Sequence, residues 1–443
     1  MKNIFLLSLV LLLASCDKFL DIQPTGKVIA RTGEEYRALL TGAYDEFPND
    51  RSLSTLRTDE MFLDKTDLTP NDYNTYFDIW VWNDATPSET TASFNWMHFY
   101  HPIYIASYII EKEGEIEEAS PADVSQLVGE AYMLRAYSYF ILVNLYGKPY
   151  TKCNPTTDLG VPLMVSADVE AVLERSTVEQ VYQQILSDID MAKQYLNVDK
   201  WEDDFKYRFN KISADALLAR VCLYMGRWQE SLDASKAVIA AYPELEDITT
   251  TGYTMPDNYK SKEAIVCLER VMPVAYKSIG YPDKNFITSI VTGDLRKNRY
   301  FKAKTSQVYD LLKGGTNDTR STFRSAEFYL TAAEAAARLG DLNEAIDHMT
   351  PIVNNRYLAA RRTPTINAMK AMTQDQLIDA ILESRRIELC FEGHRWFDLR
   401  RTTQQSITKK YGDDETYILE EGDSRYTILI PKEAISANPL LAQ

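Results

Sequence analysis

The sequence has 443 residues, of which 45% are hydrophobic and 25% are charged, values typical of a folded globular protein. Its length exceeds that of one minimal domain and allows a large core without metals or disulfides. The net charge of −16 makes a nucleic-acid backbone a poor partner.

The first residues are typical of an export signal. Lys2 precedes an apolar run over residues 4–14, which is shorter than the ~20 residues that a transmembrane helix needs. The run ends in Leu-Ala-Ser-Cys at residues 13–16, which resembles the lipobox where bacterial lipoproteins are cleaved and acylated. We therefore predict a signal peptide over residues 1–15 and a lipid anchor on Cys16. The alternative is an ordinary signal peptide with a chance cysteine.

Beyond residue 30 the hydrophobic periodicity is mostly helical. Residues 49–95 break this pattern, because they are rich in Asp, Asn, Thr and Pro and carry several aromatic side chains, which predicts an aromatic loop. Helices are expected after a capping box of Thr32 and Glu35, around 96–113, from Pro121 to Gly147, and after a cap at Ser176 (with Glu179) or Thr177 (with Gln180).

Two later segments resemble each other. Residues 216–232 and 330–346 both place small side chains one helical turn apart, turn at a glycine, and then open a second helix. This pattern is typical of tetratricopeptide helix–turn–helix repeats. The stretch between them, residues 243–322, is irregular apart from a possible strand at 264–268. The predicted fold is mainly α, a tetratricopeptide-like helical-repeat scaffold with long irregular loop insertions and few short strands.

The last strong helix starts at a capping box of Thr373 and Gln376 and is predicted to continue to Arg401. Its second half spaces Arg and Glu three residues apart, as in Arg385/Glu388 and Glu392/Arg395, between bulky apolar residues. This spacing predicts ion-paired, partly buried packing.

Four segments, in order along the chain, resemble the RagB/SusD family of Bacteroidetes outer-membrane lipoproteins. Residues 16–24 resemble the start of the processed family members, and residues 129–147 resemble their first repeat signature. Residues 386–400 are similar to the C-terminal signature, the most specific of the set, and residues 430–439 match the usual ending. The chain is short for the family and lacks the Gly-Tyr that often follows the final Asn-Pro, which weakens the transfer of a ligand site.

The resemblance implies a SusD-like domain over residues 16–443, with an N-terminal part at about 17–240 and a C-terminal part at about 241–443. It implies a cell-surface protein, lipid-anchored to the outer membrane, that captures oligosaccharide or, in some members, peptide. The expected partner is a SusC-like TonB-dependent transporter that receives the ligand. Neither catalysis nor a cofactor is implied.

Sugar recognition needs flat aromatic faces with amides, carboxylates or guanidinium groups beside them. Trp80, Trp82 and Asn83 offer this chemistry in a polar segment, and an extended backbone would place both indoles on one face. Tyr281, between Gly280 and Pro282, is a second candidate. The competing interpretation is that these rings fill gaps between loop and helix. If they bind sugar, Trp82→Ala weakens ligand binding far more than it lowers stability.

Catalytic and metal sites find little support. His394 lies in a packed helical segment without a nucleophile motif, and His98 and His101 lack a third ligand at a supporting spacing. Small buried thiols are expected rather than a disulfide at Cys153, Cys222, Cys267 and Cys390, which contain no CxxC pair. A catalytic pair of glycosidase carboxylates is recognised by the distance between them in space, which the sequence does not give. A surface glycoside hydrolase is therefore an alternative. A tetratricopeptide scaffold for protein partners is another.

Overall fold

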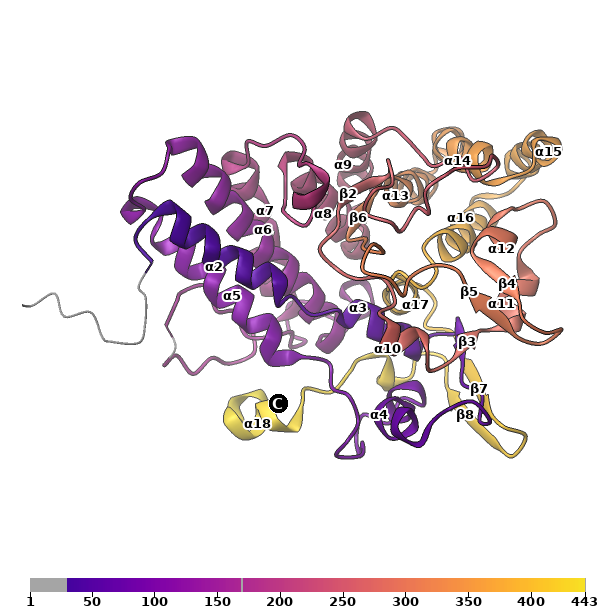
Figure 1. The fold of residues 1–443 in the computed structure, drawn as a ribbon, viewed down its shortest axis with the longest axis horizontal. Coiled ribbons are helices and arrows are strands. Elements are labelled where there is room, and N and C mark those ends of the chain that lie inside the picture. Colours follow the sequence, from indigo (N-terminus) through magenta and orange to yellow (C-terminus); the bar gives the residue numbers. More distant parts are fainter. Residues whose placement is uncertain (1–29, 169, 443) are drawn as a thin grey trace, which may run out of the picture.

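The structure is a computed structural model that describes residues 30–168 and 170–442, so the predicted signal peptide and Cys16 lie outside the described residues. Helices packed in pairs form its frame and run across the molecule (Figure 1). This confirms the mainly α prediction. The longer helices are α2 (Gly33–Asp45), α5 (Trp96–Glu111), α6 (Pro121–Tyr146), α7 (Val178–Tyr195), α8 (Lys211–Met225), α9 (Trp228–Ala241), α13 (Ser325–Leu339), α14 (Leu342–Arg356), α15 (Ala359–Lys370) and α16 (Gln374–Glu388).

The predicted helix starts are confirmed, because each depends on a local interaction. Thr32, Thr177 and Thr373 each accept a hydrogen bond from the backbone N–H three residues on, and the side chain at that position bonds back to the threonine N–H. These capping boxes satisfy backbone donors that a helix start otherwise leaves unpaired. Of the two candidate caps for α7, the structure uses Thr177.

The two similar segments form the helical hairpins α8–α9 and α13–α14. Gly226 and Gly340 end the first helix of each hairpin in the left-handed region, at φ 75° and 90°, where glycine is favoured. Helix α9 packs directly against α13. The two repeats are therefore neighbours in space although a long insertion separates them in sequence.

The segment 49–95 is more ordered than the sequence suggested. Its elements are α3 (Asp50–Leu53), a 3₁₀ turn (Ser54–Arg57), β1 (Met61–Phe62) and α4 (Pro70–Trp80). The prediction of an irregular loop is wrong for α4, since the Thr69 side chain caps it and Pro70 occupies the first turn. Tyr73, Phe77 and Trp80 then follow helical rather than strand spacing.

The insertion 243–322 consists of short elements joined by turns. The possible strand at 264–268 is confirmed as β2, which pairs with β6, and β3 pairs with β1, with Met61 opposite Pro282. The pairing of β1 with β3 therefore connects the two insertions. The short elements here are β2 (Ala264–Val266), α10 (Val274–Lys277), β3 (Tyr281–Pro282), α11 (Lys284–Ser289), α12 (Arg296–Arg299), β4 (Phe301–Ala303), β5 (Tyr309–Leu311) and, just beyond, β6 (Phe323–Arg324).

The prediction of one helix from Thr373 to Arg401 is wrong. Helix α16 ends at Glu388, the backbone takes positive φ at Phe391 (61°) and Gly393 (75°), and α17 (Arg395–Arg401) follows. A Cβ at Gly393 would lie 2.6 Å from the Arg51 carbonyl oxygen, so this turn packs tightly against α3. A hairpin of β7 (Ile407–Tyr411) and β8 (Glu415–Leu419) comes next, and α18 (Lys432–Ala437) lies near the C-terminus (Figure 1).

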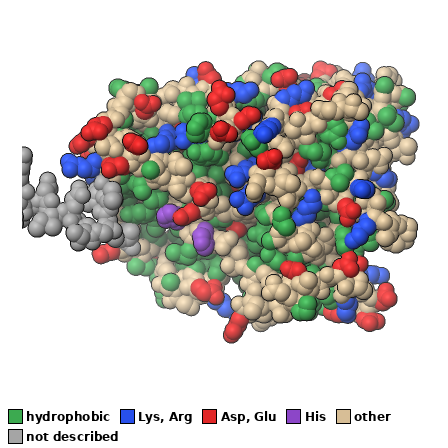
Figure 2. All heavy atoms as spheres, in the orientation of Figure 1, with side chains coloured by type: hydrophobic (Ala, Val, Ile, Leu, Met, Phe, Trp, Pro, Cys, Tyr) green, Lys and Arg blue, Asp and Glu red, His purple; other side chains and the backbone are tan. Residues whose placement is uncertain are grey.

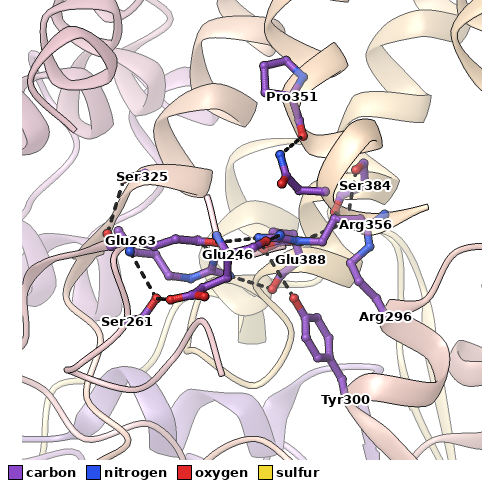
Figure 3. A network of polar contacts seen from close by, with 12 residues as sticks. Glu246, Ser261, Glu263, Arg296, Tyr300, Ser325, Pro351, Arg356, Ser384 and Glu388 are labelled. Atoms are coloured by element: carbon purple, nitrogen blue, oxygen red, sulfur yellow. Dashed lines mark hydrogen bonds and ion pairs between the residues drawn. The ribbon is translucent and has the colours of Figure 1, made fainter. Parts of the chain in front are cut away.

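The charged residues of the C-terminal signature are buried and ion-paired, as predicted, but their partners are remote in sequence. Glu388 and Glu263 both accept hydrogen bonds from Arg356, those to Glu388 at 2.8 and 2.9 Å (Figure 3). Both carboxylates also accept from Arg324, Glu388 at 2.9 Å. Arg296 also contacts Glu388, with 3.3 Å between the guanidinium and the carboxylate. The network therefore fastens the 243–322 insertion and the end of α14 to α16.

Acidic and basic side chains are mixed on the face shown in Figure 2, with hydrophobic groups between them. Within the described ranges no helix is long and apolar enough to cross a membrane. Cys222, Cys267 and Cys390 are buried free thiols, and Cys153 is a half-buried one.

Candidate functional site

Trp80 and Trp82 are both buried, each with 1% of its surface exposed. Trp80 is the last residue of α4, and its indole N–H donates to the Met61 carbonyl at 3.1 Å. Trp82 has a left-handed backbone (φ 60°) and donates to the Arg57 carbonyl at 2.8 Å. The segment is therefore not extended, and neither ring lies on an open face.

Lys409, on β7, packs against the faces of both indole rings. Its Nζ lies 4.3 Å from the Trp82 ring centroid and 5.0 Å from that of Trp80. The same Nζ donates to the carbonyls of Leu56 at 2.6 Å and Trp80 at 2.8 Å. Burial and the charge of Arg57 lower the pKa of Lys409 well below its usual value, and the cation–π contacts with the two rings offset part of that penalty on the charged form. A residue far along the chain thus covers part of both rings.

Asn83 organises the loop that follows α4. Its side-chain amide donates to Asp78 at 2.9 Å and to the Thr86 carbonyl at 2.9 Å. Asp78 also accepts from the Ser88 N–H at 2.7 Å and the Thr91 hydroxyl at 2.8 Å. The loop is therefore fixed from its two ends, and Asn83 is half-buried within it.

Tyr281 is half-buried on β3, at a different place from Asn83. Its hydroxyl donates to Asp67 at 2.7 Å and accepts from Lys304 at 2.8 Å, and its ring packs on Phe62 at 5.8 Å between centroids. The structure thus does not bring the four candidate residues together into one site.

A pocket of 690 Å³ lies over α4 and includes Trp82 and Asn83 in its wall. We call it the tyrosine pocket. The other residues of its wall are Tyr73, Asn74, Phe77 and Asp78 of α4, Val81, Asp84, Ala85 and Ser88 beyond it, Tyr417 of β8, and Ser424, Arg425, Thr427 and Leu429. The volume lies in the usual range for small-ligand sites, about 300–1,000 Å³.

Tyr73 and Tyr417 are the aromatic residues of this pocket that remain accessible. Tyr73 is 38% exposed and stacks on Phe77 with 4.4 Å between ring centroids. Phe77 in turn packs edge-on against Tyr417 at 5.6 Å and Tyr411 at 4.9 Å. The hairpin β7–β8 therefore supports the aromatic face of α4. Helical spacing from Tyr73 to Phe77 was a signal for part of this wall, whereas nothing in the sequence pointed to Tyr417.

Polar groups with unused hydrogen-bonding capacity stand beside these rings. Within the described part of the chain, the Tyr73 hydroxyl, the Asn74 side-chain amide and the Ser424 hydroxyl make no hydrogen bond. By contrast Asp84 is held by Arg57 through two bonds of 2.6 and 2.8 Å. Flat rings with unpaired donors and acceptors next to them suit a polar ligand that has an apolar face.

Asp59 lines a larger pocket of 910 Å³, whose other walls include Trp80 and residues of β1, α11 and β7, and the buried Glu60 follows Asp59 in the chain. Burial would raise the pKa of Asp59, but Arg395 and Arg386 hold it well below its usual value. Burial and the charge of Asp59 raise the pKa of its neighbour Glu60 to about 8. The charged groups at this end of the pocket therefore pair with one another, and no accessible aromatic pair accompanies them among the described lining residues.

Replacing Glu60 by glutamine is expected to flatten the pH dependence of stability. Because the native state holds the Glu60 proton up to a pKa of about 8, against 4.5 ordinarily, stability falls as pH rises through that window. Glu60→Gln keeps a neutral side chain at all pH values. We expect it to raise the free energy of unfolding by about 1–2 kcal/mol above pH 8, with little change at acid pH.

Urea titrations across this pH range measure the effect, with Glu89→Gln as a control that removes a charge at an exposed position. A Glu60→Gln protein whose stability follows the wild-type pH profile would show that Glu60 ionises normally.

His394 and His101 each contact a charged side chain of the protein itself. His394 is buried with Nε2 3.4 Å from Arg51, and burial together with that positive charge lowers its pKa far below the usual value. His101 pairs with Glu46 at 3.0 Å. Throughout the described ranges, no three His, Cys, Asp or Glu side chains are grouped to hold a metal ion.

Comparison with known proteins gives a consistent result along the chain. Residues 18–223 match a SusD-like family model described as starch-binding associating with outer membrane, and residues 274–443 match the model of the SusD family. A SusD-like protein of Formosa agariphila, P38, is 27% identical, covering 91% of this chain and 92% of its own length. A SusD-like protein of Bacteroides ovatus is 21% identical over 90% of this chain and 82% of its own.

Solved structures show the same fold. A SusD superfamily protein of Bacteroides thetaiotaomicron superposes with a TM-score of 0.76 at 22% identity, covering 93% of this chain and 99% of its own. A SusD-like protein described as laminarin-binding superposes with a TM-score of 0.61 at 20% identity, covering 84% and 92%. The helical frame with its insertions is thus a shared architecture.

Proposed function

The chain belongs to the SusD/RagB family, and from this premise we propose that it is a non-catalytic glycan-binding lipoprotein that takes its ligand in the tyrosine pocket. It captures oligosaccharide at the cell surface and passes it to a SusC-like TonB-dependent transporter. Acylation of Cys16 anchors it to the outer membrane, the compartment that the family description names.

The accessible pair Tyr73 and Tyr417 is the observation that carries this proposal. A pyranose ring has an apolar face of C–H groups and a rim of hydroxyls. An aromatic ring packs against the first, while side chains such as Asn74 and Ser424, at the pocket wall, hydrogen-bond the second. Packing on Phe77 and the β7–β8 hairpin holds the tyrosines in place before the ligand arrives, which lowers the entropic cost of binding.

The two carboxylates of the tyrosine pocket are bound by neighbouring side chains, which disfavours the hydrolase alternative. Asp78 accepts hydrogen bonds from Asn83, Ser88 and Thr91, and Asp84 is bound by Arg57. Both therefore hold the loop, whereas a glycosidase needs two carboxyl groups placed about 5–10 Å apart on either side of a glycosidic bond. Incubation with polysaccharide should release no reducing ends, and release would support the hydrolase.

Tyr73→Ala is expected to weaken glycan binding about tenfold, because it removes an aromatic contact worth about 1.4 kcal/mol. A glycan array with the purified protein selects the ligand, and calorimetry with its oligosaccharides measures the affinity. Starch- and laminarin-derived sugars belong in the panel, since the family description and one structural neighbour name them.

Tyr73→Phe is the matched control, since it keeps the ring and removes only the hydroxyl, and it should retain most of the affinity. Binding that is equally strong in wild type and Tyr73→Ala would rule out this pocket. Absence of binding to every glycan would favour the tetratricopeptide scaffold instead.

A further inference from the structure

A second pocket adjoins the tyrosine pocket. It measures 560 Å³ and lies between residues 87–94 and the C-terminal residues 428–442, and we call it the C-terminal pocket. Asn83, Asp84, Ser88 and Leu429 line both pockets, so the two hollows share a boundary. Leu429 at this boundary is 57% exposed. Figure 1 shows α4 and α18, which contribute to the two pockets, along the same edge of the molecule.

The walls of the C-terminal pocket are anchored to the end of α6. The Tyr146 hydroxyl donates to the Phe94 carbonyl at 2.9 Å, which fixes one wall. The Ile428 N–H donates to the Leu145 carbonyl at 3.1 Å, which fixes the other. Both walls are thus bonded to the buried C-terminal end of one helix, which sets their spacing without a ligand.

The C-terminal pocket also carries polar side chains that the fold leaves unused. Glu89 and Ser93 line one wall, and Lys432 and Glu433 line the other. Their side chains make no hydrogen bond or ion pair with any described residue, and all four are exposed. Buried apolar groups such as Phe94 and Ile428 form the base between them. This arrangement of an apolar base and a polar rim repeats the chemistry of the tyrosine pocket.

We propose that the C-terminal pocket is a second subsite, which takes the continuation of a glycan chain held in the tyrosine pocket. The inference rests on the proposed function. A ligand that fills both pockets is an oligosaccharide with several linked sugars, and each sugar seated beyond the first pocket adds contacts without a second loss of translational freedom. Affinity therefore rises with chain length until both pockets are filled.

The test measures affinity by calorimetry over oligosaccharide ladders from disaccharide to hexasaccharide. Malto-, laminari-, cello-, xylo- and manno-oligosaccharides serve as probes. We expect the wild type to bind the longest member of the recognised ladder about tenfold more tightly than the shortest. Glu433→Trp, which fills the second pocket, should reduce the longest sugar to the affinity of the shortest and leave the shortest unchanged.

Ser436→Trp is the matched control, because it places the same side chain on α18 at an exposed position outside the pocket wall. It should behave like the wild type, and the thermal midpoint of both variants reports their folding. Equal affinity along the recognised ladder, or length dependence that survives in a folded Glu433→Trp protein, overturns the second subsite only. Binding of no ladder, or affinities unaffected by Tyr73→Ala, overturns the proposed function with it.

Discussion

Replacing Trp82 by alanine is expected to lower the free energy of unfolding by about 3–5 kcal/mol, the usual cost of removing a buried indole. The variant also loses the hydrogen bond to the Arg57 carbonyl and leaves the Lys409 ammonium without one of its two ring faces. Glycan affinity of the folded protein should stay within about threefold of the wild type, because the ring offers no exposed face to a ligand. Urea denaturation and calorimetry measure the two quantities.

Tyr73→Ala supplies the opposite pattern, a small loss of stability with a large loss of affinity, so the two variants control for each other. The sequence offered Trp82 as a candidate for sugar binding, beside the interpretation that its ring fills a gap between loop and helix. A Trp82→Ala protein with wild-type stability and lost binding would restore that assignment and would mean that the loop opens in solution.

The helical frame was predictable because its signals are local. A capping box needs only residues three apart, as at Thr32 and Thr373, and a hairpin turn needs a glycine that tolerates positive φ, as at Gly226. The family resemblance rested on similar short segments, and the family models match residues 18–223 and 274–443. Helix α4 carried the same kind of signal at Thr69 and Pro70, but its polar, aromatic-rich composition was interpreted as a loop.

The candidate site was less predictable, because exposure is decided by residues remote in sequence. Whether Trp82 faces water depends on Lys409 and on Trp396 and Tyr426, all more than three hundred residues away. Tyr73 is supported through Phe77 by Tyr417, from a hairpin that no motif marked. Composition could indicate that residues 49–95 contain aromatic rings and amides. It could not indicate which of these rings are buried in the core and which stay accessible to a ligand.

The partners in the ion pairs of the C-terminal signature were also not predictable from sequence spacing. Spacing suggested Arg385 with Glu388, whereas Arg385 bonds Asp398 at 2.9 Å and Glu388 bonds Arg324 and Arg356. The i to i+3 pairing on an exposed helix adds only about 0.2–0.5 kcal/mol. In the buried network, however, each charge depends on its partners, because an unpaired buried charge is costly.

Glu388→Gln is therefore expected to lower the free energy of unfolding by about 3–5 kcal/mol at neutral pH, since it keeps the volume and leaves buried arginines short of one negative charge. Burial would raise the pKa of Glu388, but Arg356, Arg324 and Arg296 hold it well below 4.5. Its contribution is thus present above pH 4.5 and is lost as pH falls through the lower native pKa. Urea denaturation at several pH values should show wild type and variant converging in acid.

Glu344→Gln is the control for this prediction, because Glu344 pairs with Lys236 at 2.7 Å on the surface, where such a pair contributes about 0–1 kcal/mol. Added salt should weaken that surface pair and leave the Glu388 effect largely intact, since buried charges are poorly screened. If Glu388→Gln cost no more than Glu344→Gln, the network would not be what fastens the 243–322 insertion to α16. The second insertion, paired to the first through β1 and β3, would then need another anchor to hold its position beside the helical frame.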